Sequence, residues 1–376
     1  MIYTMRRERL NAPGRRLLAV SDIHAHGHYL KKLLEKALFS PEDELIIIGD
    51  ILEKGPYSLE TLRYVMELEK LPNVHVLAGN VDVWQLELIA STEPASTEML
   101  LKHIKRAGKI WGGSLFLDLC KEMGLEEPKD LEEMKAAKER AAICFHRELE
   151  FISNRPTVLE AGRFTFVHGG LFEGWEKSEG QDATPLLKYD NFLERCGIFP
   201  GYVVTGHWPV CLYRHDRTEF NPLIDRKKHV ISIDGGCGLK RDGQLNCLIL
   251  PDEMASAESL SWVYWDGFEE MTAMDEQAEQ ETTVYIQYMD SCVERISPGR
   301  EQAGELVTVR HLSTGRIVEI PEEYLFEEKG RLCLDDYCDY RFAVKRGERV
   351  AFVEKNGLGS LIKKDGVSCW YNGSLK

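Results

Sequence analysis

Aspartate, asparagine and histidine residues follow several short apolar runs of the sequence, at the points where the runs end. Carboxylate oxygens, amide oxygens and imidazole nitrogens are groups with which proteins bind divalent metal ions. Two such ions about 3.5–4 Å apart need a bridging carboxylate and further ligands on both sides. Asp50 is the natural bridge, and the other side chains divide between the two ions. The candidate ligands are Asp22, His24, Asp50, Asn80, His168 and His207.

Each of these residues alone is weak evidence for a metal site. An Asp or Asn after a strand usually forms a turn or caps a helix, and a His on an apolar strand is usually a hydrogen-bonded core residue. The order of the residues, their placement at strand ends and the adjacent glycines argue against a chance combination. The joint pattern therefore predicts a site for two metal ions.

Three apolar strands alternate with two helices in the first part of the chain. This order implies parallel strands joined by right-handed crossovers. Functional residues should then gather beyond the carboxyl ends of the strands, which is where Asp22, Asp50 and Asn80 fall. The expected strands are 17–20, 45–48 and 74–78, and the expected helices are 29–39 and 59–71.

The rest of the chain divides into three further regions. Residues 84–153 carry helical patterns with many charges, so we expect a helical insertion there. Strand patterns return between residues 164 and 250. The acidic stretch 266–283 is expected to be a linker, and the short strands and turns beyond it predict a small all-β domain.

Composition excludes several classes of protein. The 376 residues carry a formal net charge of −15, and such a surface should repel long nucleic acids unless basic residues are concentrated locally. We find no apolar stretch of membrane-spanning length and no signal peptide, so no membrane association is expected. The ten cysteines form no CxxC pair, which favours free thiols in the reducing cytoplasm.

Five sequence blocks in a fixed order resemble those of a known family. They are Asp22-Ile23-His24, Gly49-Asp50, Gly79-Asn80, Val167-His168-Gly169-Gly170 and Thr205-Gly206-His207-Trp208-Pro209. Together with Ile233-Asp234 and the glycines that follow, they cover roughly residues 17–250. The sequence resembles the calcineurin-like metallophosphoesterases, in particular the phosphoprotein phosphatase and diadenosine tetraphosphatase branch.

The resemblance implies an α/β fold, a two-sheet metallophosphoesterase sandwich flanked by helices. We expect this catalytic domain over residues 1–275, with the helical insertion at about 84–153. Residues 276–376 lie outside the resemblance, and their pattern is that of a small, vaguely SH3-like β domain that could dock a protein.

The resemblance also implies how the metal ligands are shared. Manganese is the ion most expected, with iron or zinc as alternatives. A hydroxide activated by both ions would attack phosphorus in line. One ion would be held by Asp22, His24 and Asp50, and the other by Asp50, Asn80, His168 and His207.

The sequence departs from the family at the position of the general acid. In the phosphatase branch a His directly follows the metal-binding Asn and is held by an Asp of a GDxxDRG block. Here these positions are Val81 and Glu53, and the Arg of the block is Lys54, which lacks the bidentate fork of Arg. The candidate catalytic residues are Asp50, His24, Asp82 and Lys54.

Three hypotheses follow from the missing acid. The first is hydrolysis of substrates with good leaving groups, since losing one acid costs about 10²–10⁴-fold only for a poor leaving group. The second gives the role of the acid to His26 or His28. The third is a metal-binding pseudoenzyme that recognises a phosphorylated ligand, against which the retention of all six ligand types argues.

The expected function is thus that of a dinuclear metal-dependent phosphoesterase acting on a phosphate ester or anhydride. A phosphodiesterase and a dinucleoside polyphosphate hydrolase are the alternatives. The expected partner is a phosphorylated small molecule, a nucleotide or a phosphoprotein. A base could stack on Trp84, Trp111, Trp175 or Trp208, of which Trp208 is the best candidate because it follows His207.

Overall fold

A computed structural model of the chain describes residues 3–280, 283–296 and 306–376. Its internal contacts divide the chain into two compact units. The first unit comprises Met1–Val210 and Asn221–Asp266, and the second comprises Cys211–Phe220 and Gly267–Lys376. The chain therefore enters the second unit twice.

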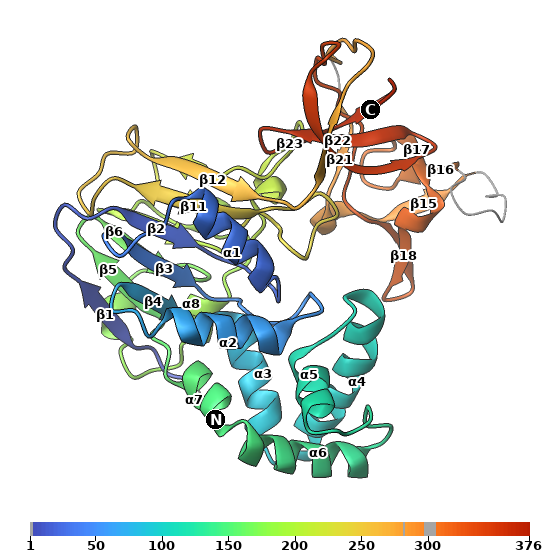
Figure 1. The fold of residues 1–376 in the computed structure, drawn as a ribbon. Coiled ribbons are helices and arrows are strands. Elements are labelled where there is room, and N and C mark those ends of the chain that lie inside the picture. Colours follow the sequence, from blue (N-terminus) through green and yellow to red (C-terminus); the bar gives the residue numbers. More distant parts are fainter. Residues whose placement is uncertain (1–2, 281–282, 297–305) are drawn as a thin grey trace. The chain divides into compact units, whose positions relative to one another are not determined.

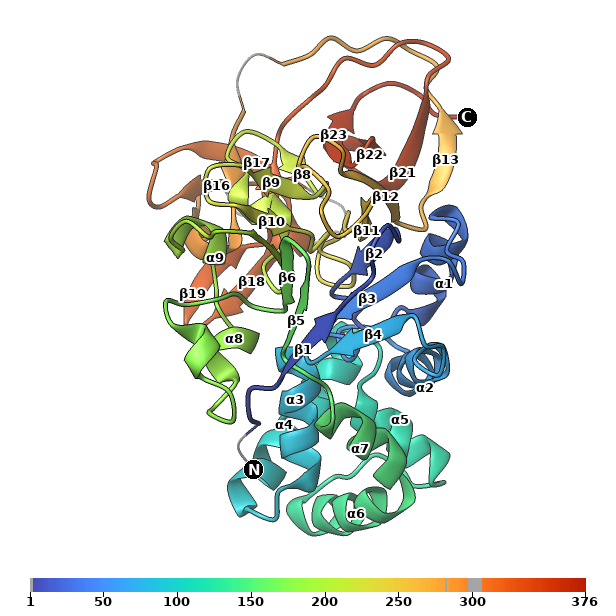
Figure 2. The same cartoon turned by 90° about the vertical axis from the view of Figure 1, so that its left-hand side faces the viewer.

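The first unit is a sandwich of two sheets (Figures 1 and 2). Its strands are β1 Arg7–Leu10, β2 Leu17–Val20, β3 Glu44–Ile48, β4 Val74–Leu77, β5 Val158–Ala161, β6 Phe164–Val167, β7 Tyr202–Thr205, β9 Leu223–Asp225, β10 Val230–Ser232, β11 Leu245–Leu250 and β12 Ser261–Trp265. One sheet has the order β12-β11-β2-β3-β4 and the other β1-β5-β6-β7-β10-β9. The pairs β2–β3 and β3–β4 are parallel, as predicted.

The core of this unit lies between the two sheets. Every residue of β2 and β3 is buried, as expected for central strands covered on both faces. On the inner face, Ala19 and Ile46 belong to the same apolar cluster as Phe166 and Val204 of the opposite sheet. On the outer face lie the helices α1 Gly27–Lys36 and α2 Ser58–Leu68 (Figure 2). The predicted two-sheet α/β sandwich with flanking helices is confirmed.

Five helices occupy the stretch for which an insertion is expected. They are α3 Asn80–Ala90, α4 Pro94–Ile110, α5 Leu115–Glu122, α6 Leu131–Cys144 and α7 His146–Ser153, and they pack mainly on one another. Local capping sets some of their starts: the Asp130 carboxylate accepts the backbone N–H groups of Glu132 and Glu133 at the start of α6. Two single-turn helices, α8 Thr184–Leu187 and α9 Phe192–Arg195, lie between β6 and β7.

The second unit is all-β, as predicted, and its sheets are antiparallel. Its strands are β8 Thr218–Glu219, β13 Glu269–Thr272, β14 Tyr285–Ile286, β15 Val293–Arg295, β16 Leu306–His311, β17 Ile317–Pro321, β18 Leu325–Glu328, β19 Arg331–Leu334, β20 Tyr337–Cys338, β21 Arg349–Asn356, β22 Gly359–Lys364 and β23 Val367–Tyr371. The largest sheet has the order β13-β21-β22-β23-β8.

The division into units differs from the expected boundary at residue 275. The stretch expected as a linker contains β13, which pairs with β21. In addition, β8 comes from the middle of the chain and pairs with β23 near its end. A pairing of two residues across such a separation leaves no periodic signal in the sequence. The division into domains 1–275 and 276–376 stays a prediction.

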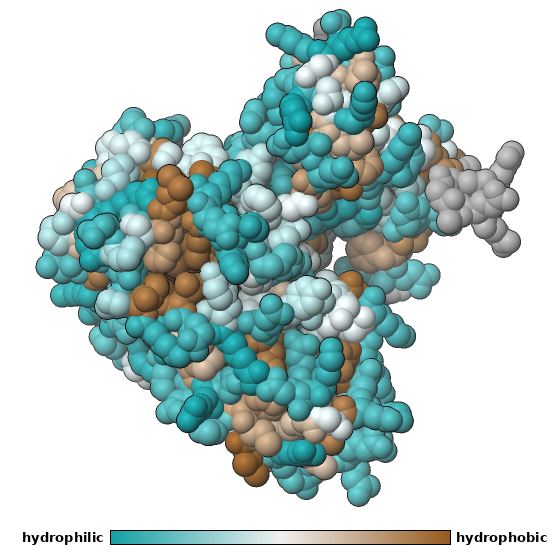
Figure 3. Space-filling view, in the orientation of Figure 1, coloured by the Kyte–Doolittle hydropathy of each residue, from teal (hydrophilic) through white to brown (hydrophobic). Residues whose placement is uncertain are grey.

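Hydrophilic residues cover most of the face drawn in Figure 3, in keeping with the net charge of −15. In the part of the chain that the structure describes, no helix combines the length and apolar character needed to cross a membrane.

The interleaved units make a prediction about truncation. Phe220 is fully buried, its backbone N–H donates to the Gly366 carbonyl, and the Lys363 ammonium lies 4.8 Å from its ring centroid. In the full chain, Phe220→Ala should lower the free energy of unfolding by about 3–5 kcal/mol, as for other buried phenylalanines. In a chain ending at Asp266, which lacks these neighbours, the same substitution should cost much less. Urea denaturation of the four proteins tests this, and equal losses in both backgrounds would contradict it.

Candidate metal centre

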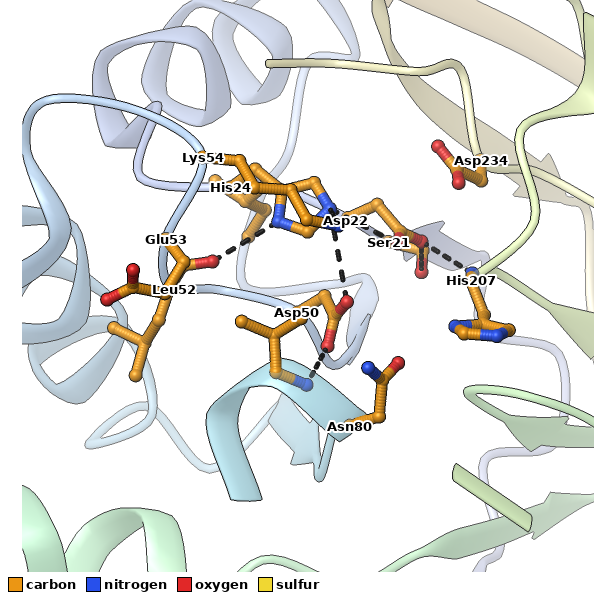
Figure 4. A network of polar contacts seen from close by, with 12 residues as sticks. Ser21, Asp22, His24, Asp50, Leu52, Glu53, Lys54, Asn80, His207 and Asp234 are labelled. Atoms are coloured by element: carbon orange, nitrogen blue, oxygen red, sulfur yellow. Dashed lines mark hydrogen bonds and ion pairs between the residues drawn. The ribbon is translucent and has the colours of Figure 1, made fainter. Parts of the chain in front are cut away.

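The predicted ligands lie at the carboxyl ends of strands from both sheets. Asp22 and Asp50 follow β2 and β3, and Asn80 is the first residue of α3, after β4. His168 and His207 follow β6 and β7 of the other sheet. Figure 4 shows the labelled ligand side chains directed into one region.

Two sets of potential metal-binding atoms share one carboxylate. In the first set, side-chain atoms of Asp22, His24 and Asp50 all lie within 4.8 Å of one another. In the second set, the same holds for Asp50, His168 and His207. Because Asp50 belongs to both sets, the arrangement suits two ions bridged by this carboxylate.

Hydrogen bonds to the main chain orient two of the imidazoles. The Nδ1 atom of His24 lies 3.2 Å from the Leu52 carbonyl oxygen, and that of His168 lies 2.8 Å from the Ile48 carbonyl oxygen. A ring nitrogen that donates to a carbonyl leaves the other nitrogen with its lone pair, available to a metal. The Nε2 atom of His168 lies 3.0 Å from the Asn80 Oδ1 atom, which places Asn80 with the second set.

His207 is oriented by a residue that the sequence did not point to. Its Nε2 atom lies 2.8 Å from the Asp190 Oδ1 atom, and this hydrogen bond lowers the pKa of Asp190. The backbone N–H of His207 donates to the Asp22 Oδ2 atom at 3.0 Å. Asp190 lies in an irregular, exposed segment and forms no motif with His207, so no signal identifies it.

A buried oxygen without a partner indicates that the first set fits a cation. The Asp22 Oδ2 atom accepts hydrogen bonds from the Ser21 hydroxyl and the His207 N–H, but the Asp22 Oδ1 atom is buried and has no hydrogen-bond partner. A buried carboxylate oxygen without a hydrogen bond is costly, and a divalent cation would supply the missing interaction. The Lys54 ammonium lies 3.3 Å from the His24 Nε2 atom, so one positive charge already stands beside these ligand atoms.

The surroundings of the two histidines shift their pKa values in opposite directions. Burial, and next the Lys54 charge, lower the pKa of His24 to about 3. Burial also acts to lower the pKa of His168, but the Asp50 and Asp22 carboxylates outweigh it and raise the pKa to about 10. His24 is therefore neutral at pH 7, whereas His168 must release a proton when a cation takes its nitrogen.

Four of the predicted ligands have unusual backbone conformations. The φ angles of Asp22, His24, Asp50 and His207 are 56°, 45°, 49° and 67°, in the left-handed region that few residues other than glycine adopt. Such residues persist only where the surrounding structure enforces them, and they gather at functional sites. The backbone around the centre is thus held in place by packing.

Two glycines allow the chain segments of the centre to approach closely. A Cβ atom on Gly79 would lie 2.0 Å from the Asp50 backbone nitrogen, and one on Gly206 would lie 1.8 Å from the Ser21 Oγ atom. Neither position has room for a side chain. The glycines of the Gly-Asn and Gly-His pairs are therefore needed for strand ends to meet, rather than for turns alone.

Asp234, which follows β10, is a further acidic residue beside the first set (Figure 4). Its Oδ1 atom accepts the Gly236 N–H at 2.7 Å, whereas its Oδ2 atom is buried without a partner. Burial, and next the Asp22 carboxylate, raise the pKa of Asp234. The structure thus adds a buried carboxyl group to the centre.

Comparison with known proteins agrees with this geometry. A model of the family described as calcineurin-like phosphoesterase matches residues 15–224, more than half of the chain. The chain belongs to the calcineurin-like phosphoesterase family. The metallophosphoesterase class predicted from the sequence is confirmed.

Relatives of this phosphoesterase include symmetrical bis(5'-nucleosyl)-tetraphosphatases. That of Erwinia tasmaniensis is 35% identical over 92 residues, which cover 24% of this chain and 33% of the relative. That of Methylobacillus flagellatus is 26% identical over 235 residues, which cover 60% of this chain and 70% of the relative. The chain thus spans about a third of the length of the first of these relatives.

The solved structures that match this chain include two phosphoesterases. A protein serine/threonine phosphatase from Saccharomyces cerevisiae has a TM-score of 0.43 at 14% identity, covering 71% of this chain and 85% of that one. A metallophosphoesterase from Sphaerobacter thermophilus has a TM-score of 0.36 at 17% identity, covering 66% and 88%.

The structure separates the roles open to Asp82 and Lys54. Both oxygens of the buried Asp82 carboxylate face the main chain, where they accept the N–H groups of Ile51 and Leu52. This gives Asp82 a positioning role, holding the loop after Asp50. Lys54, by contrast, directs its ammonium to the metal-binding atoms.

The Glu53 carboxylate is bonded to groups other than residue 81, so it is not free to orient a histidine there. Its carboxylate is buried, accepts the Leu115 N–H at 2.7 Å and lies 2.5 Å from the Nε2 atom of His103 on α4. At residue 81 it is the backbone that acts, since the Val81 N–H donates to the Asp50 Oδ1 atom at 2.8 Å. Glu53 therefore joins the loop to the helical insertion.

The two histidines considered as a relocated acid lie differently. The Nδ1 atom of His26 lies 2.5 Å from the His24 carbonyl oxygen, and burial lowers the pKa of His26. His28 is exposed on α1. The structure describes no contact of either histidine with the metal-binding atoms, so neither is assigned the role of the acid.

The close approach at Gly206 makes a first prediction for this site. Gly206→Ala should disrupt the Asp22 carboxylate, and the metal content after manganese loading should fall from two ions per chain to fewer than one. Gly197→Ala is the matched control, because a Cβ atom there meets nothing within 4 Å. Elemental analysis gives both contents, and two ions in Gly206→Ala would show that the approach is not needed.

The shared carboxylate makes a second prediction. A ligand present at about 100 times its Kd stabilises a protein by about 2.7 kcal/mol per site, so manganese should raise the melting temperature of the wild type. Asp50→Asn should lose this shift at both sites, whereas Asn80→Ala should lose only part of it. Equal shifts in the two variants would mean that Asp50 does not bridge. Calorimetric melting with and without manganese measures them.

Proposed function

We propose that the chain is a dinuclear metal-dependent phosphoesterase that hydrolyses phosphoric anhydrides or esters with good leaving groups, and that a dinucleoside polyphosphate is its substrate. The observation that carries the proposal is the pair of donor sets that share Asp50. The relatives are named as bis(5'-nucleosyl)-tetraphosphatases, and this supports the choice of substrate.

The proposed ligand sets follow the geometry. Asp22, His24 and Asp50 hold one ion, and Asp50, Asn80, His168 and His207 hold the other. Manganese is the ion we propose, with iron or zinc as alternatives, because three imidazoles disfavour calcium. Two bound cations would supply water acidic enough to act as a nucleophile at neutral pH and would balance the charge of the phosphoryl oxygens.

Side chains around the ligand sets hold the ligands in position without binding the ions. Asp190 orients the His207 ring, and Asp82 fixes the loop that follows Asp50. Lys54 is the one proposed catalytic residue outside the ligand sets. Its flexible side chain brings a positive charge to the phosphate oxygens, as a point charge rather than a bidentate fork.

The side chain at residue 81 determines the class of leaving group. Val81 cannot donate a proton, so the leaving oxygen departs as an anion. A nucleotide leaves through a phosphate group, whose second pKa is about 6, and needs no acid at neutral pH. An alkoxide such as that of serine is far more basic and leaves slowly without one. Anhydrides are therefore favoured over phosphoserine.

We infer that the protein acts in the cytoplasm on a small phosphorylated molecule. All ten cysteines are free, which suits a reducing compartment. The net charge of −15 disfavours long nucleic acids as substrates. Docking of a protein through the second unit is a further proposal, for which fold-level analogy is the only support.

The proposal predicts a steep dependence of rate on the leaving group. With manganese, nitrophenyl phosphate and diadenosine tetraphosphate should be hydrolysed at least about 10²-fold faster than phosphoserine, and Asp50→Asn should abolish all three activities. Bis-nitrophenyl phosphate identifies a phosphodiesterase if it is the best substrate.

Two results would contradict the proposal. No turnover of any ester at full metal occupancy would indicate a pseudoenzyme that binds a phosphorylated ligand. Fast hydrolysis of phosphoserine that is lost in His26→Ala would show that His26 supplies the proton.

A further inference from the structure

A cavity of about 290 Å³ is lined in part by Asn80, a candidate metal ligand. Asn80, Val81, Trp84 and Glu87 of α3 line one part of it, and Leu187 and Lys188, at the end of α8, line another. Asn80 also contacts His168, so a ligand in the cavity would lie near the candidate metal ligands.

The lining combines an apolar wall with polar groups of both signs. Val81 and Leu187 are buried apolar residues, and Trp84 is half-buried. Lys188 is exposed, whereas Glu87 is partly buried. An apolar, aromatic cleft with a few polar groups is the usual form of a small-molecule site. The volume is near the lower limit of about 300 Å³ for such sites, so it suits a single ring system.

The indole ring of Trp84 packs against another ring. Its centroid lies 4.8 Å from that of His103, with the two ring planes at 88°, and His103 is paired with the buried carboxylate of Glu53. A ring fixed in this way loses little freedom when a ligand stacks on it, which favours binding.

A second hollow has one lining residue in common with the cavity. It shares Lys188 with the cavity, and its lining includes Asp190 and Arg195. Asp190 is the hydrogen-bond partner of the candidate ligand His207. Two cationic side chains, Lys188 and Arg195, therefore line a hollow that also contains a residue bonded to the metal centre.

We propose that the cavity binds one nucleobase of the substrate, which stacks on Trp84, and that Lys188 contacts the phosphate chain where it leaves the cavity. The inference rests on the proposed function and names the substrate class as a nucleotide. Glu87 would accept a hydrogen bond from an amino group of the base. Aromatic stacking tolerates every base, so the cavity selects nucleotides over inorganic phosphates.

Trp84 replaces Trp208 as the best candidate for stacking. Trp208 and Trp175 are only 8% and 7% exposed, so neither offers a ring face of useful size to a ligand. Trp84 leaves part of its ring open to the cavity. The sequence favours Trp208 because it follows His207, whereas Trp84 lies one helical turn after Asn80 on α3 and lines the same cavity.

Calorimetric titration of the manganese-loaded full-length chain tests the proposal. ADP and inorganic pyrophosphate both carry two linked phosphates, but only ADP carries a nucleoside with its base. The wild type should bind ADP at least about tenfold more tightly than pyrophosphate. In Trp84→Ala the ratio of the two Kd values should fall about tenfold, equivalent to about 1.4 kcal/mol. Trp84→Phe should keep most of the wild-type ratio, because Phe can also stack.

Two further variants make the test specific. Trp262→Ala removes a tryptophan that is 39% exposed on β12 and should leave the ratio unchanged. Lys188→Gln, at an exposed position, should weaken both ligands several-fold and leave their ratio unchanged, because Lys188 contacts phosphate.

Three results would overturn the inference: equal affinities of the wild type for ADP and pyrophosphate, a wild-type ratio in Trp84→Ala, or no effect of Lys188→Gln on either ligand. Because the readout is binding, these results are distinct from a failure of the proposed hydrolysis. A chain that binds ADP through Trp84 but hydrolyses no ester would retain the nucleotide site and lose the proposed enzymatic function.

Discussion

The hydrogen bond from the Val81 N–H to the Asp50 carboxylate is the interaction on which the centre depends. Asp50 belongs to both sets of metal-binding atoms, so its orientation sets the geometry of each. The bond forms only because the ends of β3 and β4 approach as closely as Gly79 allows. The packing of two adjacent parallel strands, rather than any one side chain, thus determines where two cations can lie.

This dependence explains how the chain can carry Val at residue 81 and still bring the candidate metal ligands together. Residue 81 serves the centre through its backbone, so its side chain can change without moving Asp50. Valine there removes a proton donor and adds an apolar wall to the neighbouring cavity. The Glu53 carboxylate is paired with His103. Under the proposed function, this change would restrict hydrolysis to good leaving groups and leave the arrangement of the candidate ligands unchanged.

The sequence predicted the parts of this structure that depend on local patterns. Apolar runs identify β2, β3 and β4, and the parallel order brings the residues after them to one edge. Contacts that depend on tertiary packing left no such trace. His103 meets Glu53 only because α4 packs against the loop, and Asp190 reaches His207 from an irregular segment. The exchange of residues 211–220 into the second unit rests on pairing between β8 and β23, which is too short for any periodicity.

That exchange has a consequence for how the protein is made in the cell. A ribosome releases β8 and Phe220 well before it has synthesised β22 and β23, the last strands of the chain. At about 5–20 residues per second, the apolar side chain of Phe220 waits roughly 7–30 s for the strand that covers it. Folding of the second unit therefore cannot finish until β22 and β23 have left the ribosome.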